Sequence, residues 1–252
     1  MIIEQLLCDE FVIQKILLGE MTENCRHILS LIDNASRNLQ FEECREDLFF
    51  ASTFSRFRNL LDATVVLSEN DLVKEAAIIS RSIYEICFKV KAVKNDTNLI
   101  DQVIVEQLIT KKKRIKKFLD GKLKTDKSNL EILRKELEKV ESEIAEANLN
   151  GLGKNKWAEK ADLKGTYLTT YDILCDFSHI SASDLDSLLM INDGKVDRVI
   201  FGRDSEEKDT IMFYTALIST ELLAVFCDYF EIDLRSEIDE LRAQFERRIQ
   251  ES

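Results

Sequence analysis

The residues of this chain that could carry chemistry gather in one stretch, from Tyr171 to His179. His179 is one of only two histidines, and Asp176 precedes it by three positions, a spacing at which helical side chains meet. A neighbouring carboxylate favours the charged imidazolium and holds it in place. His179 is therefore a candidate general acid or base, or an anion contact. The alternative is a histidine at a helix C-terminus that satisfies nearby carbonyl groups.

Arg81 is the second candidate for chemistry. Its guanidinium can bind a carboxylate or a phosphate through two parallel hydrogen bonds. Glu85 follows one helical turn later, so the two side chains can also pair with each other. Arg81 could therefore bind an anion, or it could form a structural ion pair with Glu85, and the sequence leaves both interpretations open.

The helix that must position Arg81 is predicted over residues 71–94. Apolar residues recur on one face, from Leu72 to Val93, and a second apolar face contains Tyr84 and Phe88. A helix that is apolar on two sides lies at the centre of its bundle. We expect Asp71 to cap its N-terminus.

The composition predicts a mainly α-helical bundle. The chain has no proline and only 7 glycines among 252 residues, which favours long helices joined by short loops. Other helices are expected over residues 2–37, 40–68, 166–179, 206–230 and 234–250. Residues 187–201 alternate around Asp193-Gly194, which predicts one small β-hairpin.

Residues 99–148 are predicted to form a projecting antiparallel helical hairpin. This hairpin is inserted into a core domain that consists of residues 1–98 and 149–252. Two narrow apolar seams flank a turn near Gly121, as in a coiled coil. Residues 111–127 contain nine Lys or Arg and two Asp. The basic run 111–117 could contact phosphate or an acidic protein, and its alternative is a solvated helix face.

The net charge and the motif content of the chain argue against several classes of protein. The net charge of −12 argues against a protein that binds nucleic acid over its whole surface. Six cysteines without a CxxC pair, and the absence of clustered histidines, predict no metal site. No glycine-rich fingerprint or P-loop is present, so no cofactor is expected. The N-terminus has no signal-peptide pattern, and residues 210–230 read as a core helix rather than a membrane span. We therefore expect a cytoplasmic protein.

Short motifs in a fixed order resemble a family of bacterial helical proteins, the domain of unknown function numbered five-six-seven-seven. They are Ser80-Arg81-Ser82-Ile83-Tyr84-Glu85, then Trp157-Ala158-Glu159-Lys160, then Tyr171 to Ser178-His179, within a span from about Leu48 to Phe226. The resemblance implies a shared polar set of Arg81, Glu85, Tyr171, Ser178 and His179. It implies no activity. We therefore expect Arg81, Glu85 and His179 to form one cluster.

A more distant similarity is to HEPN domains, helical bundles that often act as metal-independent ribonucleases in toxin and antiphage systems. Their Arg and His lie four to six residues apart on one helix, whereas Arg81 and His179 are far apart here. A ribonuclease would need these two residues to meet across helices, with His179 as base and Arg81 stabilising phosphate charge.

Three functions follow from these observations. The first is a sensing or interaction module, in the setting of antiphage defence, whose polar pocket binds a small anionic ligand or a partner group. The second is the HEPN-like ribonuclease, the one case in which RNA is a partner. The third is a structural protein that forms a homo-oligomer through the hairpin.

Overall fold

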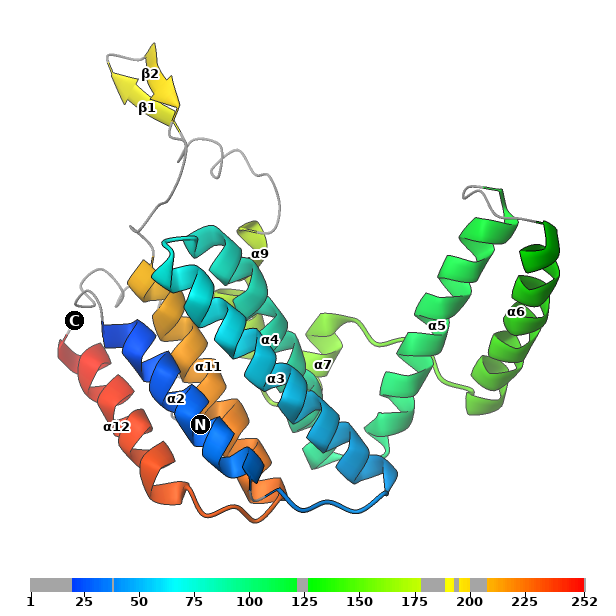
Figure 1. Cartoon of the computed structure of the whole chain (residues 1–252), viewed down its shortest axis with the longest axis horizontal. Coiled ribbons are helices and arrows are strands. Elements are labelled where there is room, and N and C mark those ends of the chain that lie inside the picture. The colour runs from blue at the N-terminus through cyan, green and yellow to red at the C-terminus, as the bar shows by residue number, and fades with distance from the viewer. Residues whose placement is uncertain are drawn as a thin grey trace.

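The computed structural model describes residues 20–37, 39–121, 127–177, 189–192, 195–199 and 208–251. The chain is mainly helical, as the composition predicts (Figure 1). The first 18 positions of the helix predicted over 2–37 lie outside the described residues. The longer helices are α2 (Glu20–Arg37), α3 (Arg45–Glu69), α4 (Val73–Asn95), α5 (Leu99–Leu119), α6 (Lys127–Ala147), α11 (Lys208–Tyr229) and α12 (Arg235–Glu251).

Helix α11 lies at the centre of the bundle and packs against α2, α3, α4 and α12 (Figure 1). Its length and composition would suffice to cross a membrane, but 83% of its apolar window is buried inside the protein. Apolar side chains around the whole circumference are expected of a helix that is surrounded on all sides.

Aromatic side chains hold α3 against α11. Phe50, Phe54 and Phe57 are buried, and all three contact Phe226. Phe50 also stacks on Tyr229 with ring centroids 3.7 Å apart. Since large aromatics bury more area than any other side chain, this cluster contributes much of the packing energy between the two helices.

Helix α4 is buried on two faces, which confirms its predicted central position. Ile83 and Val90 lie on one face, and Tyr84 and Phe88 lie on the other; none of the four is more than 1% exposed. Tyr84 Oη donates a 3.1 Å hydrogen bond to the Tyr214 carbonyl on α11, so its buried hydroxyl is satisfied.

The prediction that Asp71 caps the N-terminus of α4 was wrong. Asp71 has φ +55° and follows the end of α3, where Leu72 N donates to the Leu67 carbonyl over 2.9 Å. This six-to-one bond and the left-handed residue define a Schellman ending. Asp71 pairs with Lys208 instead. Glu231 ends α11 in the same way, with φ +55°. Glycine adopts this left-handed conformation without steric cost, whereas Asp71 and Glu231 adopt it with some steric strain.

Helices α5 and α6 form an antiparallel hairpin that extends away from the bundle (Figure 1). We call this hairpin the arm. Its apolar seam is narrow: Ile115 and Val140 are buried, whereas most other apolar side chains of the arm are partly exposed. Lys112 and Lys116 each place Nζ 3.0 Å from Glu141 Oε1. The basic run of α5 thus contacts acidic residues of α6.

Three shorter helical segments follow the arm, and the first and last of them lie against α4. They are α7 (Lys154–Lys160), α8 (Lys164–Thr166) and α9 (Asp172–Asp176), with a π-helical turn, η2 (Tyr167–Tyr171), between the last two. Strands β1 (Leu189–Asn192) and β2 (Lys195–Val199) pair antiparallel, with a shift in register between Met190 and Ile191. The predicted turn residues, 193 and 194, lie outside the described residues.

Candidate functional site

Four polar side chains from α4, α7 and η2 meet at one place. Arg81 Nη2 donates to Glu85 Oε1 over 3.1 Å, and Tyr171 Oη donates to the same oxygen over 2.9 Å. Lys154 Nζ is a third donor to Glu85 Oε1. Arg81 Nε also donates to Tyr171 Oη over 3.2 Å. We call these four residues the Glu85 cluster.

The Glu85 cluster lies at the edge of the core. The exposed fractions of the side chains rise from 23% for Arg81 to 32% for Glu85 and 45% for Lys154. Tyr171 is only 3% exposed and forms the floor. A solute can therefore reach the charged groups without unfolding the bundle.

Tyr171 occupies the last position of the π-helical turn η2. Its ring stacks on Tyr167, with centroids 5.1 Å apart and an angle of 18° between the planes. The Arg81 guanidinium and the Lys154 ammonium each lie 5.7 Å from the Tyr171 ring centroid. Both cations thus interact with the π-system as well as with Glu85.

The helix predicted over 166–179 is not a regular α-helix, because the π-turn η2 lies within it. A regular helix of 100° per residue would place Tyr167, Tyr171, Cys175 and Ser178 on one face, but η2 interrupts the regular repeat at the first two of them. Segments with i→i+5 hydrogen bonds are rare and recur at functional sites. No periodicity in the sequence marks the turn.

Hydrogen bonding sets the charge state of the Glu85 cluster. Burial raises the pKa of Glu85, but hydrogen bonds from Lys154 and Tyr171 outweigh it, and the pKa lies below its ordinary value of 4.5. Burial raises the pKa of Tyr171 above its ordinary value of 10.0. Glu85 is therefore ionised at neutral pH, and the Tyr171 hydroxyl keeps the proton that it donates. Two cations face one carboxylate, so the cluster has a net charge of +1.

The structure brings together three of the five residues predicted for the site: Arg81, Glu85 and Tyr171. Ser178 and His179 lie outside the described residues, so the part of the predicted cluster that involves them stays a prediction. Lys154 was missed, because it lies in a glycine-containing stretch that reads as a linker.

A second partly buried carboxylate, Glu106 of α5, was also missed. Its Oε1 accepts hydrogen bonds from Trp157 Nε1 over 2.7 Å and from Leu152 N over 3.0 Å. Its Oε2 accepts one from Lys89 Nζ of α4 over 2.7 Å. The Glu106 side chain is 17% exposed. We call these residues the Glu106 anchor, because they fix the base of the arm to the bundle.

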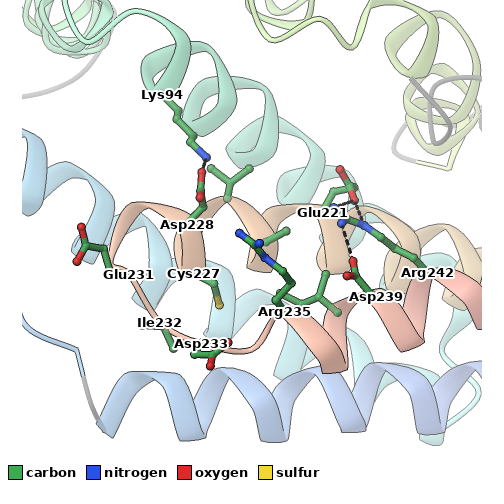
Figure 2. Close-up of a pocket in the computed structure, with 13 residues that line it drawn as sticks. Lys94, Glu221, Cys227, Asp228, Glu231, Ile232, Asp233, Arg235, Asp239 and Arg242 are labelled. Atoms are coloured by element: carbon green, nitrogen blue, oxygen red, sulfur yellow. Dashed lines mark hydrogen bonds and ion pairs between the residues drawn. The ribbon is translucent and has the colours of Figure 1, made fainter.

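A cleft of about 700 Å³ lies between α11, α12 and the last turn of α4 (Figure 2). Its floor includes Val225, Cys227 and Ile238, which are mostly buried. Burial raises the pKa of the Cys227 thiol to about 12, so this thiol is protonated and unreactive at neutral pH. None of the four residues of the Glu85 cluster is among the described residues that line the cleft.

Ion pairs occupy both ends of this cleft (Figure 2). Lys94 pairs with Asp228 at one end. At the other end, Arg242 donates to Glu221 over 2.9 and 2.6 Å and approaches Asp239 at 3.3 Å. The Glu221 side chain, which is 14% exposed, is thus compensated by Arg242. The charged residues at both ends of the cleft are thus paired within the protein.

Within the residues that the structure describes, no three His, Cys, Asp or Glu side chains are arranged to hold a metal ion. The described cysteines Cys25, Cys44, Cys87, Cys175 and Cys227 are free thiols. The donor set of the Glu85 cluster, with two cations around one carboxylate, suits an anion rather than a metal.

The fold and site define a helical-bundle protein with a polar cluster formed by α4, α7 and η2. The profile of a family of unknown function, DUF5677, matches residues 47–196, more than half of the 252-residue chain. The chain belongs to this family, and the match ends earlier than the predicted limit near Phe226. No curated protein and no solved structure matches the chain. The family segment contains all four residues of the Glu85 cluster.

Proposed function

We propose that this protein is a binding module whose Glu85 cluster receives the anionic group of a small ligand or of a partner protein. The observation that carries the proposal is the convergence of Arg81 and Lys154 on one carboxylate and one aromatic ring. The cluster has excess positive charge in a half-buried place, where ionic hydrogen bonds are stronger than in water.

The arrangement suggests how an anion would enter. Lys154 is the most exposed member, and its long side chain can leave Glu85 at small cost because partly exposed ion pairs contribute little. Arg81 is held by Tyr171 and Glu85 on either side, so its guanidinium is oriented before a ligand arrives. Preorganised donors reduce the entropy lost on binding.

Free cysteines support a reducing, cytoplasmic setting for this function. Burial raises the pKa of the Cys87 thiol to about 12. Such a thiol is a packing group rather than a nucleophile.

A thermal-shift screen tests the proposal. The wild-type protein is heated with inorganic phosphate, a sugar phosphate, a nucleoside monophosphate and a dicarboxylate, against sodium chloride of matched ionic strength. At a concentration about 100 times Kd, a ligand adds roughly 2.7 kcal/mol of stability. We expect stabilisation by at least one anion, and its loss in Arg81→Gln and Lys154→Gln.

Arg58→Gln is the matched control, because Arg58 is also a half-exposed arginine between two carboxylates, Asp33 and Asp62. It should respond to the anion as the wild type does. An equal response of Arg81→Gln and the wild type, or no response of the wild type to any anion, would contradict the proposal.

A further inference from the structure

One face of α4 carries Arg81, Glu85 and Lys89 at intervals of four residues. Side chains at this spacing lie one above another along a helix. Arg81 and Glu85 belong to the Glu85 cluster, whereas Lys89 Nζ pairs with Glu106 Oε2 over 2.7 Å. The same face of α4 therefore touches both the Glu85 cluster and the base of the arm.

Helix α7 contacts the same two carboxylates from the other side. Lys154, its first residue, donates to Glu85, and Trp157 Nε1 donates to Glu106 over 2.7 Å. Trp157 is 2% exposed, and Lys89 Nζ lies 5.4 Å from its ring centroid. Lys154 and Trp157 are three positions apart, which is about one helical turn. Both lie on α7, a short helix of seven residues, so a shift of one residue also moves the other.

Glu106 is the point at which this network meets the arm. One carboxylate holds α4 through Lys89, α7 through Trp157, and the chain that returns from the arm through Leu152. Farther along α5 and α6 the arm extends away from the bundle (Figure 1). The three bonds to Glu106 therefore restrain the direction in which the arm points.

We propose that α7 couples the Glu85 cluster to the arm, so that a change in how Glu85 holds Lys154 alters the Trp157–Glu106 bond and the position of the arm. This inference rests on the proposed function: an anion that draws Lys154 away from Glu85 would be the signal, and the arm would be the output. Residues of α4 and of α7 contact both Glu85 and Glu106, so these groups form a connected network of the kind that transmits such changes.

The coupling can be tested without knowing the ligand. Glu85→Gln removes the charge that holds Lys154 but leaves Glu106 and Trp157 in place. Trp157 is the only tryptophan in the chain, so its fluorescence reports on the anchor alone. We expect a red shift of Trp157 emission, and amide hydrogen exchange in residues 99–106 faster by roughly threefold or more, as expected of a locally loosened segment.

Three further variants complete the test. Lys154→Gln changes the other partner at an exposed position and should give the same two effects if Glu85→Gln lowers stability too far to be measured. Glu106→Gln breaks the anchor directly and should give larger changes in both readouts. Asp62→Asn removes a carboxylate from α3, outside the network, and should change neither.

The inference is overturned if Glu106→Gln alters both readouts while Glu85→Gln and Lys154→Gln alter neither. That result would leave anion binding at the Glu85 cluster intact, because it concerns only transmission to the arm. Conversely, the expected result together with a failed anion screen would contradict the proposed ligand class while the coupling stands.

Discussion

Tyr171 Oη donates a 2.9 Å hydrogen bond to Glu85 Oε1, although the two residues are 86 positions apart in the chain. The same Tyr171 oxygen accepts a hydrogen bond from Arg81 Nε over 3.2 Å. The tyrosine thus joins Arg81 and Glu85 of α4 to the π-turn, and its hydroxyl is both donor and acceptor.

Tyr171→Phe should lower the free energy of unfolding by about 1–2 kcal/mol, because it leaves Glu85 and Arg81 each short of one hydrogen bond while the ring stack with Tyr167 remains. Urea unfolding followed by circular dichroism measures the change. Tyr167→Phe is the control, since the hydroxyl of Tyr167 has no hydrogen bond within the described part of the chain; it should stay within about 0.5 kcal/mol of the wild type. Equal effects of both variants would show that the hydroxyl network does not stabilise the fold.

The stability contributed by Glu85 should depend on pH in the acid range. Its pKa in the folded protein lies below 4.5, the ordinary value expected in the unfolded chain. A depressed carboxyl pKa contributes stability that is fully present above the unfolded value and is lost as the pH falls through the folded value. The difference in unfolding free energy between the wild type and Glu85→Gln should therefore be constant near neutral pH and shrink below about pH 4.5. A difference that grows on acidification would contradict this assignment.

Glu106→Gln should destabilise the protein by about 1–3 kcal/mol, because it weakens an ionic hydrogen bond to Lys89 in a mostly buried place. Asp101→Asn provides the comparison on the same helix. Asp101 pairs with Arg45 on the surface, with more than half of each side chain exposed, so its loss should cost less than about 0.5 kcal/mol. Chemical denaturation of the two variants in parallel would reveal whether Glu106 is an anchor or merely another surface charge.

Glu231→Gly should raise the free energy of unfolding by about 0.5–1 kcal/mol, because φ at this position is +55° and glycine adopts that conformation without steric cost. Glu231→Ala removes the same carboxylate but keeps the Cβ, so it should give no comparable gain. If alanine stabilises as much as glycine, charge repulsion rather than backbone strain explains the effect.

Much of the bundle could be predicted from the sequence because its signals are long and periodic. The two apolar faces of residues 71–94 identify α4 as central, and Tyr84 and Phe88 are buried as that pattern requires. Arg81 and Glu85 could be predicted as neighbours because they lie one turn apart on one helix. The stretch that begins at Tyr171 was a candidate from its residue types, and the family resemblance grouped Tyr171 with Arg81 and Glu85, which no periodicity does.

The rest of the site depends on features without a periodic signal. A short helix was expected only around Trp157–Ala161, and Lys154, the first residue of α7, lies close to Gly151 and Gly153 in a stretch that was predicted as a linker. Glu106 lies in a helix of the arm, where a carboxylate is ordinarily solvated; only the return of the chain at Leu152 and Trp157 buries it. Asp71 was predicted as an N-cap because Asp is a favoured N-cap residue, but it occupies the left-handed C′ position of the preceding helix, which Asp can adopt although glycine is preferred there.

Anion binding at the Glu85 cluster is tested most directly by isothermal titration calorimetry of the wild type, Arg81→Gln and Arg58→Gln with the anion that stabilises the wild type most. We predict saturable one-site binding to the wild type and to Arg58→Gln, and affinity for Arg81→Gln lower by at least about tenfold, the equivalent of roughly 1.4 kcal/mol for a charge-assisted hydrogen bond. Equal affinity of all three proteins would show that the anion binds elsewhere and would contradict the assignment of the Glu85 cluster as the binding site.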